Sequence, residues 1–169
     1  LQMLRACTKL RRYTHHFDEF HYHLDEQTMD VLGSSGIEKF VFRDLVIESC
    51  ERGFMDRLPE QTVAVEFTRL KAGKSRGLEV DLDRYKQMRS FTLKHCSAID
   101  SNKLRNFHRL SKINMAKCYF DRGVELGVDP MRMCQNSRGL WAVQQLRLPV
   151  CMLRDLEFLR HMPQLVVLD

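Results

Sequence analysis

The spacing of apolar residues constrains the fold of this chain more than any other feature of its sequence. Along most of the 169 residues, apolar side chains recur at intervals of three and four, which places them on one face of an α-helix. Glycine or proline interrupts this pattern at Gly33, Gly53, Pro59 and Gly127. The sequence therefore predicts an all-α protein, with five to seven helices in an irregular bundle and an extended apolar C-terminal tail.

Seven stretches carry the helical pattern between these interruptions. They are residues 4–25, residues 37–52, the stretch from Pro59 to about residue 71, a stretch capped by Asp81, and residues 101–126, 131–146 and 152–161. The segment 40–47 is rich in residues of high β propensity, so a strand there is an open alternative to a helix. We find no repeat period in the sequence.

The helical pattern divides the chain into three parts. A basic amphipathic N-terminal helix covers 1–26, a helical core covers 37–126, and a helical extension with a docking tail covers 127–169. No run of about 18 consecutive apolar residues occurs, so we expect no transmembrane span.

The beginning of the chain is basic and amphipathic. It carries Arg5, Lys9, Arg11 and Arg12, and no acidic residue precedes Asp18. Segments of this kind are typical of mitochondrial targeting peptides. We therefore expect a mitochondrial protein, on the matrix side of the inner membrane.

No arrangement of polar residues indicates catalysis. The six cysteines have wide, irregular spacings, which favours free buried thiols over a zinc site. Histidines are dense between His15 and His23, but their helical spacing does not bring enough ligands to one ion, so solvated or partner-facing histidines are favoured. We predict no enzyme activity, no catalytic residue, no metal and no cofactor.

Two segments are candidate contact sites. The predicted helix 101–120 carries five basic residues and no acid, and the chain has a net charge of +5, so this helix either faces solvent or contacts phosphate groups or an acidic partner. The five are Lys103, Arg105, Arg109, Lys112 and Lys117. The apolar tail, Leu165, Val166, Val167 and Leu168, is expected to dock on a partner.

A short segment resembles a known family. Arg57, Leu58 and Pro59, followed by Arg69 and Lys71, are similar to a pattern in the small matrix-facing accessory subunit of the mitochondrial cytochrome bc1 complex, once called the ubiquinone-binding protein. The resemblance covers about 30 residues. It implies a helical, non-catalytic subunit that packs against the matrix side of that complex.

The sequence thus predicts a structural accessory subunit of a mitochondrial respiratory complex, with complex III as the first choice. Its partners would be the other subunits of that complex and an anionic lipid such as cardiolipin. The alternative is a subunit of the mitochondrial ribosome or of an RNA-processing complex, with the basic helix 101–120 on RNA.

Overall fold

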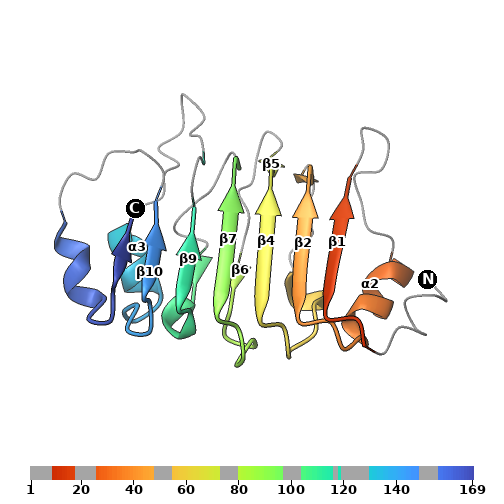
Figure 1. Ribbon diagram of the computed structural model, residues 1–169, viewed down its shortest axis with the longest axis horizontal. Helices are drawn as coiled ribbons and strands as arrows, with labels where there is room; N and C mark the ends of the chain where they lie inside the picture. The colour runs from red at the N-terminus through yellow and green to blue at the C-terminus, as the bar shows by residue number, and fades with distance from the viewer. Residues whose placement is uncertain are drawn as a thin grey trace.

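The all-α prediction is wrong, because the chain is built mainly from parallel β-strands. The computed structural model describes residues 9–17, 26–47, 55–72, 80–96, 104–115, 118, 130–148 and 156–169. Within these residues a seven-stranded sheet forms with the order β1-β2-β4-β7-β9-β10-β11, and every neighbouring pair is parallel (Figure 1). Only two α-helices occur in the same residues.

The strands of the main sheet and the elements that connect them alternate along the chain. The main strands are β1 (Arg12–His16), β2 (Lys39–Arg43), β4 (Ala64–Thr68), β7 (Ser90–Lys94), β9 (Lys112–Asn114), β10 (Gln145–Arg147) and β11 (Val167–Leu168). Two small parallel pairs join β3 (Val46–Ile47) to β5 (Lys71–Ala72) and β6 (Val80–Asp81) to β8 (Leu104–Arg105). The helices are α2 (Glu26–Gly33) and α3 (Pro130–Asn136), and the 3₁₀ helices are η1 (Met55–Arg57), η3 (Phe107–Arg109) and η4 (Glu157–His161).

The strands follow one another in sequence order, so the chain is a solenoid. Residues paired across neighbouring strands are 27, 25, 26, 22, 33 and 22 positions apart along the chain. Each coil adds one strand to the edge of the sheet and returns along a second layer, in which α3 and β6 lie behind the sheet in Figure 1. The reading of the sequence as free of repeats is therefore wrong.

Each coil repeats one pattern of buried residues. In the second coil Ile37, Phe40, Phe42 and Leu45 are all 5% exposed or less. Buried residues take the same four places in the next three coils: Thr62, Val65, Phe67 and Leu70; then Met88, Phe91, Leu93 and Cys96; then Leu110, Ile113, Met115 and Cys118. The intervals are three, two and three, because a strand turns alternate side chains inward and a bend stands at each end. These intervals resemble the three and four of an α-helix, which is why the sequence pattern predicts helices.

Backbone hydrogen bonds also repeat from coil to coil. The carbonyl oxygen of Arg11 accepts bonds from the N–H groups of Glu38 and Lys39, at 3.1 and 3.0 Å. The same double acceptor recurs in the next five coils, at Glu38, Val63, Arg89, Ser111 and Gln144. Since the bonds join successive coils, each coil is held in register by its neighbours.

The end of the strand repeats a left-handed backbone position. Asp44, Arg69 and His95 occupy equivalent places just after β2, β4 and β7, with φ of 63°, 55° and 52°. The chain turns away from the sheet there, and the N–H groups of Asp44 and Arg69 donate to the carbonyls of Thr68 and Lys94 at 2.9 and 2.8 Å.

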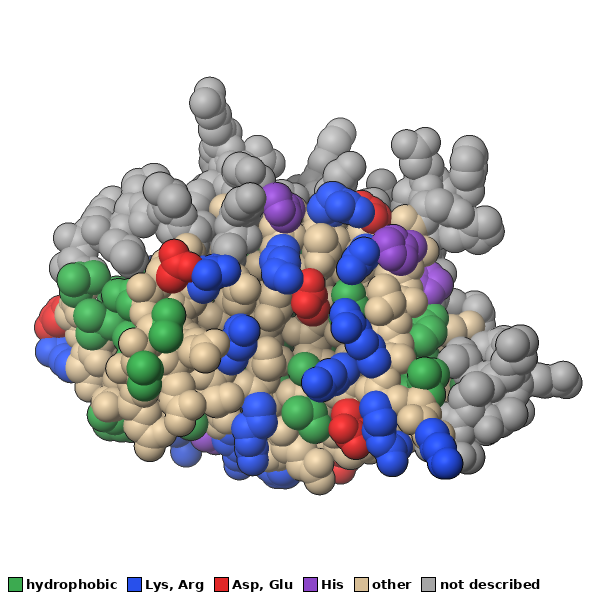
Figure 2. Space-filling model, in the orientation of Figure 1, with side chains coloured by type: hydrophobic (Ala, Val, Ile, Leu, Met, Phe, Trp, Pro, Cys, Tyr) green, Lys and Arg blue, Asp and Glu red, His purple; other side chains and the backbone are tan. Residues whose placement is uncertain are grey.

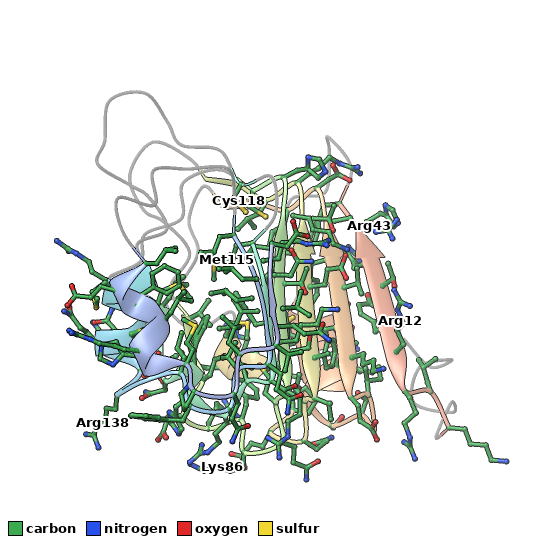
Figure 3. The ribbon with its side chains drawn as sticks, turned by 60° about the vertical axis from the view of Figure 1, so that its left-hand side comes forward. Arg12, Arg43, Lys86, Met115, Cys118 and Arg138 are labelled. Atoms are coloured by element: carbon green, nitrogen blue, oxygen red, sulfur yellow. The ribbon has the colours of Figure 1, made fainter. Side chains whose placement is uncertain are left out.

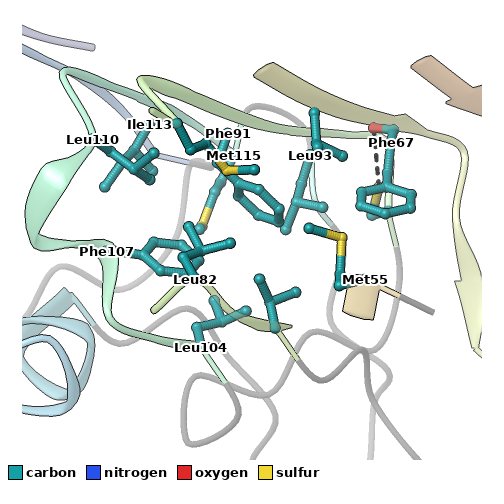
Figure 4. Close-up of a cluster of buried hydrophobic side chains, with 14 of the residues drawn as sticks. Met55, Phe67, Leu82, Phe91, Leu93, Leu104, Phe107, Leu110, Ile113 and Met115 are labelled. Atoms are coloured by element: carbon teal, nitrogen blue, oxygen red, sulfur yellow. Dashed lines mark hydrogen bonds between the residues drawn. The ribbon is translucent and has the colours of Figure 1, made fainter. Parts of the chain in front are cut away.

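The core lies between the sheet and the second layer, and phenylalanine rings run through it. The ring centroids of Phe42 and Phe67 are 5.5 Å apart, those of Phe67 and Phe91 6.3 Å, and those of Phe91 and Phe107 5.1 Å (Figure 4). Phe42, Phe67 and Phe91 come from successive strands of the sheet, and Phe107 in η3 extends the contact into the second layer, so these rings tie neighbouring coils and the two layers together.

Several individual predictions can be compared with the structure. The alternative of a strand within 40–47 is confirmed by β2 and β3. The helix predicted from residue 131 is confirmed only as the short α3, and 145–147 form β10 instead. The described parts of the other predicted helices contain strands, turns and 3₁₀ helices. None of the described helices is long and apolar enough to cross a bilayer.

Candidate binding face of the sheet

One face of the main sheet is left open by the second layer, and we call it the outer face. Arg12 and Arg43 project from it, whereas Met115 and Cys118 lie on the opposite side, between the sheet and the second layer (Figure 3). Seen directly, the outer face carries many Lys and Arg side chains and few acidic ones (Figure 2).

The strand register sorts the outer face into three rows that cross the strands. The start row contains Arg12, Lys39, Ala64, Ser90, Lys112, Gln145 and Val167. The middle row contains Thr14, Val41, Glu66, Thr92, Asn114 and Arg147. The end row contains His16, Arg43, Thr68 and Lys94.

Part of the middle row is sheltered although it points away from the core. Val41 is 4% exposed, Thr92 6% and Asn114 8%, and Val41 is not part of the hydrophobic core cluster. Thr14 and Arg147, at the two ends of the row, are exposed. The outer face is thus recessed at the centre of its middle row, between two rows that contain bases.

Two ion pairs lie on or beside the end row. Lys94 Nζ is 2.9 Å from Glu66 Oε1, which also accepts a 3.3 Å hydrogen bond from Thr68. Arg69 forms a two-pronged contact with Asp44, at 2.5 Å from Nε and 2.6 Å from one terminal nitrogen. The hydrogen bond and the charge of Asp44 raise the pKa of Arg69. These pairs join neighbouring coils and neutralise part of the positive charge.

Other bases of the outer face have no such partner. Arg12, Lys39, Arg43 and Lys112 form no ion pair with any residue that the structure describes. Nε of Arg43 is buried and lacks a hydrogen-bond partner. Every other buried side-chain nitrogen or oxygen in the described ranges has one. An arginine held in this way remains available to an incoming carboxylate or phosphate through its terminal nitrogens.

The structure separates the basic residues predicted for helix 101–120. Arg105 is in β8 of the second layer, and Arg109 ends η3, where its guanidinium is 3.9 Å from Asp83. Lys112 is in the start row of the outer face. Lys103 and Lys117 lie outside the described residues. The single basic helix face that sequence spacing predicted therefore does not form.

The apolar tail forms the last strand, at one edge of the sheet. Val166 is 80% exposed, Val167 46% and Leu168 41%, while Leu165 is half-buried against the core. The other large exposed hydrophobic residues of the described chain, Trp141 and Leu156, also belong to its C-terminal part. Figure 2 shows hydrophobic side chains gathered at this end. We call Trp141, Leu156, Val166, Val167 and Leu168 the C-terminal apolar edge.

The residues of the family-like segment are spread over one coil. Arg57 ends η1 and is exposed, Leu58 and Pro59 are buried, Arg69 pairs with Asp44, and Lys71 is in β5. The helix implied for this segment is absent from the coil, since β4 occupies its middle.

The predicted free, buried thiols are confirmed at the three described cysteines, Cys96, Cys118 and Cys134. The Cys96 thiol donates a hydrogen bond to the carbonyl of Phe67 and the Cys118 thiol to that of Leu93, each in the preceding coil. Both sulfur–oxygen distances are 3.6 Å. The hydrogen bond with Cys118 and burial raise the pKa of Cys96, which disfavours a reactive thiolate. Cys7, Cys50 and Cys151 lie outside the described residues.

The described histidines form no metal-binding site. His15 accepts or donates a 2.9 Å hydrogen bond with Tyr13 and packs on Phe17, with ring centroids 4.4 Å apart. His16 is exposed in the end row, and the histidines from residue 18 onward in that cluster are outside the described ranges. Where the chain is described, no group of three or more His, Cys, Asp or Glu side chains could hold a metal ion.

Comparison of the chain with family models, curated proteins and solved structures found no match. The architecture itself is informative. Coils that each add one strand to a parallel sheet, and that pair only with the neighbouring coils, form a repeat solenoid. Solenoids of this kind present an extended surface built from one position of every coil.

Proposed function

We propose that this protein is a non-catalytic interaction scaffold that binds a macromolecular partner through the outer face of its sheet. The observation that carries the proposal is the outer face itself, an open row-by-row array of side chains from seven successive strands. Parallel sheets are commonly covered on both faces by other elements. Here one face is open and carries few apolar residues, and a role in binding a partner explains both features.

The polar character of this face supports a binding role. Four of its bases have no ion-pair partner among the described residues, and they come from three different strands, β1, β2 and β9. Because the strands fix the spacing of the backbone positions that carry these bases, binding requires ordering of the side chains only and not of the backbone.

The cellular setting of the proposal comes from the sequence. The basic N-terminal segment and the resemblance around Arg57 are the support for an accessory subunit on the matrix side of complex III, which we retain as part of the proposal, and β4 stands where that resemblance implies a helix. The RNA alternative loses its main support, because the helix on which it depended does not form.

Site-specific photocrosslinking tests the proposal. A photoreactive amino acid at Thr14, exposed on the outer face, should give one defined adduct, and the same group at Gln135, exposed on α3, should not. An adduct with a respiratory-complex subunit that survives ribonuclease would agree with the proposed setting. Equal adducts from both positions, or a measured turnover by the purified protein, would contradict the scaffold role.

A further inference from the structure

We propose that the partner of the outer face is an extended acidic protein segment that lies across strands β1 to β9, over the middle row. This inference rests on the proposed function, because it names the chemistry of the partner at that same face. It is carried by charge, by the recessed centre of the middle row and by the spacing of the bases.

The register fixes the size of the segment. Neighbouring strands are about 4.8 Å apart, so the four steps from β1 to β9 span roughly 19 Å, the length of about six extended residues. The start and end rows are four residues apart along a strand, or roughly 13 Å. Side chains of an extended segment alternate in direction, so those of a segment over the middle row reach both basic rows.

The charge balance favours an acidic ligand. From β1 to β9 the three rows contain five bases, namely Arg12, Lys39, Arg43, Lys94 and Lys112. Glu66 is the acidic residue among them, and its carboxylate is already paired with Lys94. Four bases are therefore left without a carboxylate among the described residues, and the guanidinium of Arg43 is half-buried with a buried Nε that has no hydrogen-bond partner. A carboxylate from a ligand would offset the unfavourable burial of this charge.

The same rows disfavour RNA and lipid. Single-stranded RNA is usually held by aromatic side chains on which bases stack, and no aromatic residue other than His16 points outward in these rows. A membrane-binding surface presents protruding apolar residues among its bases. Here Val41 is recessed at 4% exposure. An acidic polypeptide needs neither feature.

Fluorescence anisotropy with a labelled peptide of about twelve glutamates tests the inference on the full chain. We expect saturable binding that weakens as salt increases, because the contacts are between charges. The face variant Arg12→Glu, Lys39→Glu and Lys112→Glu should lower the affinity by roughly tenfold or more, since it replaces three attractions by three repulsions. The control variant Lys86→Glu, Arg105→Glu and Arg138→Glu changes the net charge equally but lies off the outer face, and its affinity should stay within about twofold of the unmodified protein.

Three results would overturn the inference. They are equal losses in the face and control variants, tighter binding of a twelve-residue oligouridylate, and tighter binding of vesicles that contain cardiolipin. If the face variant does not fold by circular dichroism, Arg12→Gln, Lys39→Gln and Lys112→Gln provide the same test without new repulsion. A Thr14 adduct with a protein that lacks acidic segments would leave the scaffold role intact and contradict this inference alone.

Discussion

The outer face and the C-terminal apolar edge are both exposed, but they differ in strand pairing and in the character of their side chains. The outer face spans strands that have a neighbour on each side, except at the two edges, and its side chains are mostly charged or polar. In the apolar edge, Val167 and Leu168 form β11, which pairs only with β10 among the described residues, and Val166 just before it is 80% exposed. The two regions thus differ in charge and in how much apolar surface they expose.

The difference extends to hydrogen bonding. In six successive coils one carbonyl before the strand accepts two N–H groups from the next coil, ending with Gln144, which bonds Val166 and Val167 at 2.8 and 3.0 Å. The equivalent carbonyl at Val166 has no such donors in the described residues. Among the described residues β11 therefore forms one edge of the sheet, whereas the main strands from β2 to β10, which carry most of the outer face, are paired on both sides.

The largest expected effect is a difference in the free energy of unfolding between substitutions in a central coil and in the last coil. Phe91→Ala should lower the free energy of unfolding by about 3–5 kcal/mol, because the ring is fully buried between neighbouring coils. Leu165→Ala should cost only about 1–2 kcal/mol, since Leu165 is half-buried in the last coil. Urea unfolding followed by circular dichroism measures both, and equal losses would contradict the difference between centre and edge.

A smaller effect on stability, but a clear effect on association, is expected at the apolar edge. Val166→Lys with Val167→Lys should change the free energy of unfolding by less than about 0.5 kcal/mol, because both side chains are exposed. The same pair should reduce self-association at high concentration, since lysines on an edge strand discourage strand pairing. Sedimentation velocity at several concentrations checks this. Unchanged association would show that the edge is not adhesive.

On the outer face, Glu66→Gln should strengthen binding while weakening the fold slightly. The substitution removes the partner of Lys94, at a cost of about 0.2–1 kcal/mol for a partly exposed pair. The released lysine then adds a base to the end row, so the affinity for the glutamate peptide should rise roughly twofold to fivefold. Weaker peptide binding would mean that Glu66 itself contacts the ligand, contrary to an acidic partner.

The smallest effect expected is a pH dependence that arises away from both regions. Burial, with the nearby charge of Arg109, lowers the pKa of His108 in η3, although Asp83 acts in the opposite direction. The unfolded chain therefore binds a proton at a higher pH than the folded chain, and stability falls as the pH decreases through the ordinary histidine range. His108→Asn should flatten this decrease between pH 7.5 and 5.5 in urea titrations. An unchanged pH profile would assign the decrease to other groups.

The buried residues were largely visible in the sequence, but their geometry was not. Phe40, Phe67 and Leu70 are apolar residues within the stretches 37–52 and 59–71, for which the sequence predicts helices, and all three are buried. The error was in the period, because intervals of three, two and three in a coil overlap with the three and four of a helix. The signal that was missed is the return of this triplet of intervals every 22 to 33 residues, as in Ile37-Phe40-Phe42-Leu45 and Met88-Phe91-Leu93-Cys96.

The outer face could not be predicted in the same way. Arg12, Lys39, Arg43 and Lys112 are distant in sequence, and only strand register brings them to one face. Spacing within one segment groups Arg105 and Arg109 with Lys112, although Arg105 is in β8 of the second layer and Arg109 is in η3. Without the repeat, no spacing rule joins residues from different coils.

Lysine footprinting tests the central claim most directly. The protein would be acetylated briefly with and without the glutamate peptide, and the modification of each lysine quantified by mass spectrometry. We predict that Lys39 and Lys112, exposed in the start row, are modified at least about threefold more slowly when the peptide is bound. Lys86, exposed in the turn before β7, should be unchanged. Protection of Lys86 together with unaltered Lys39 and Lys112 would show that the outer face is not the binding surface.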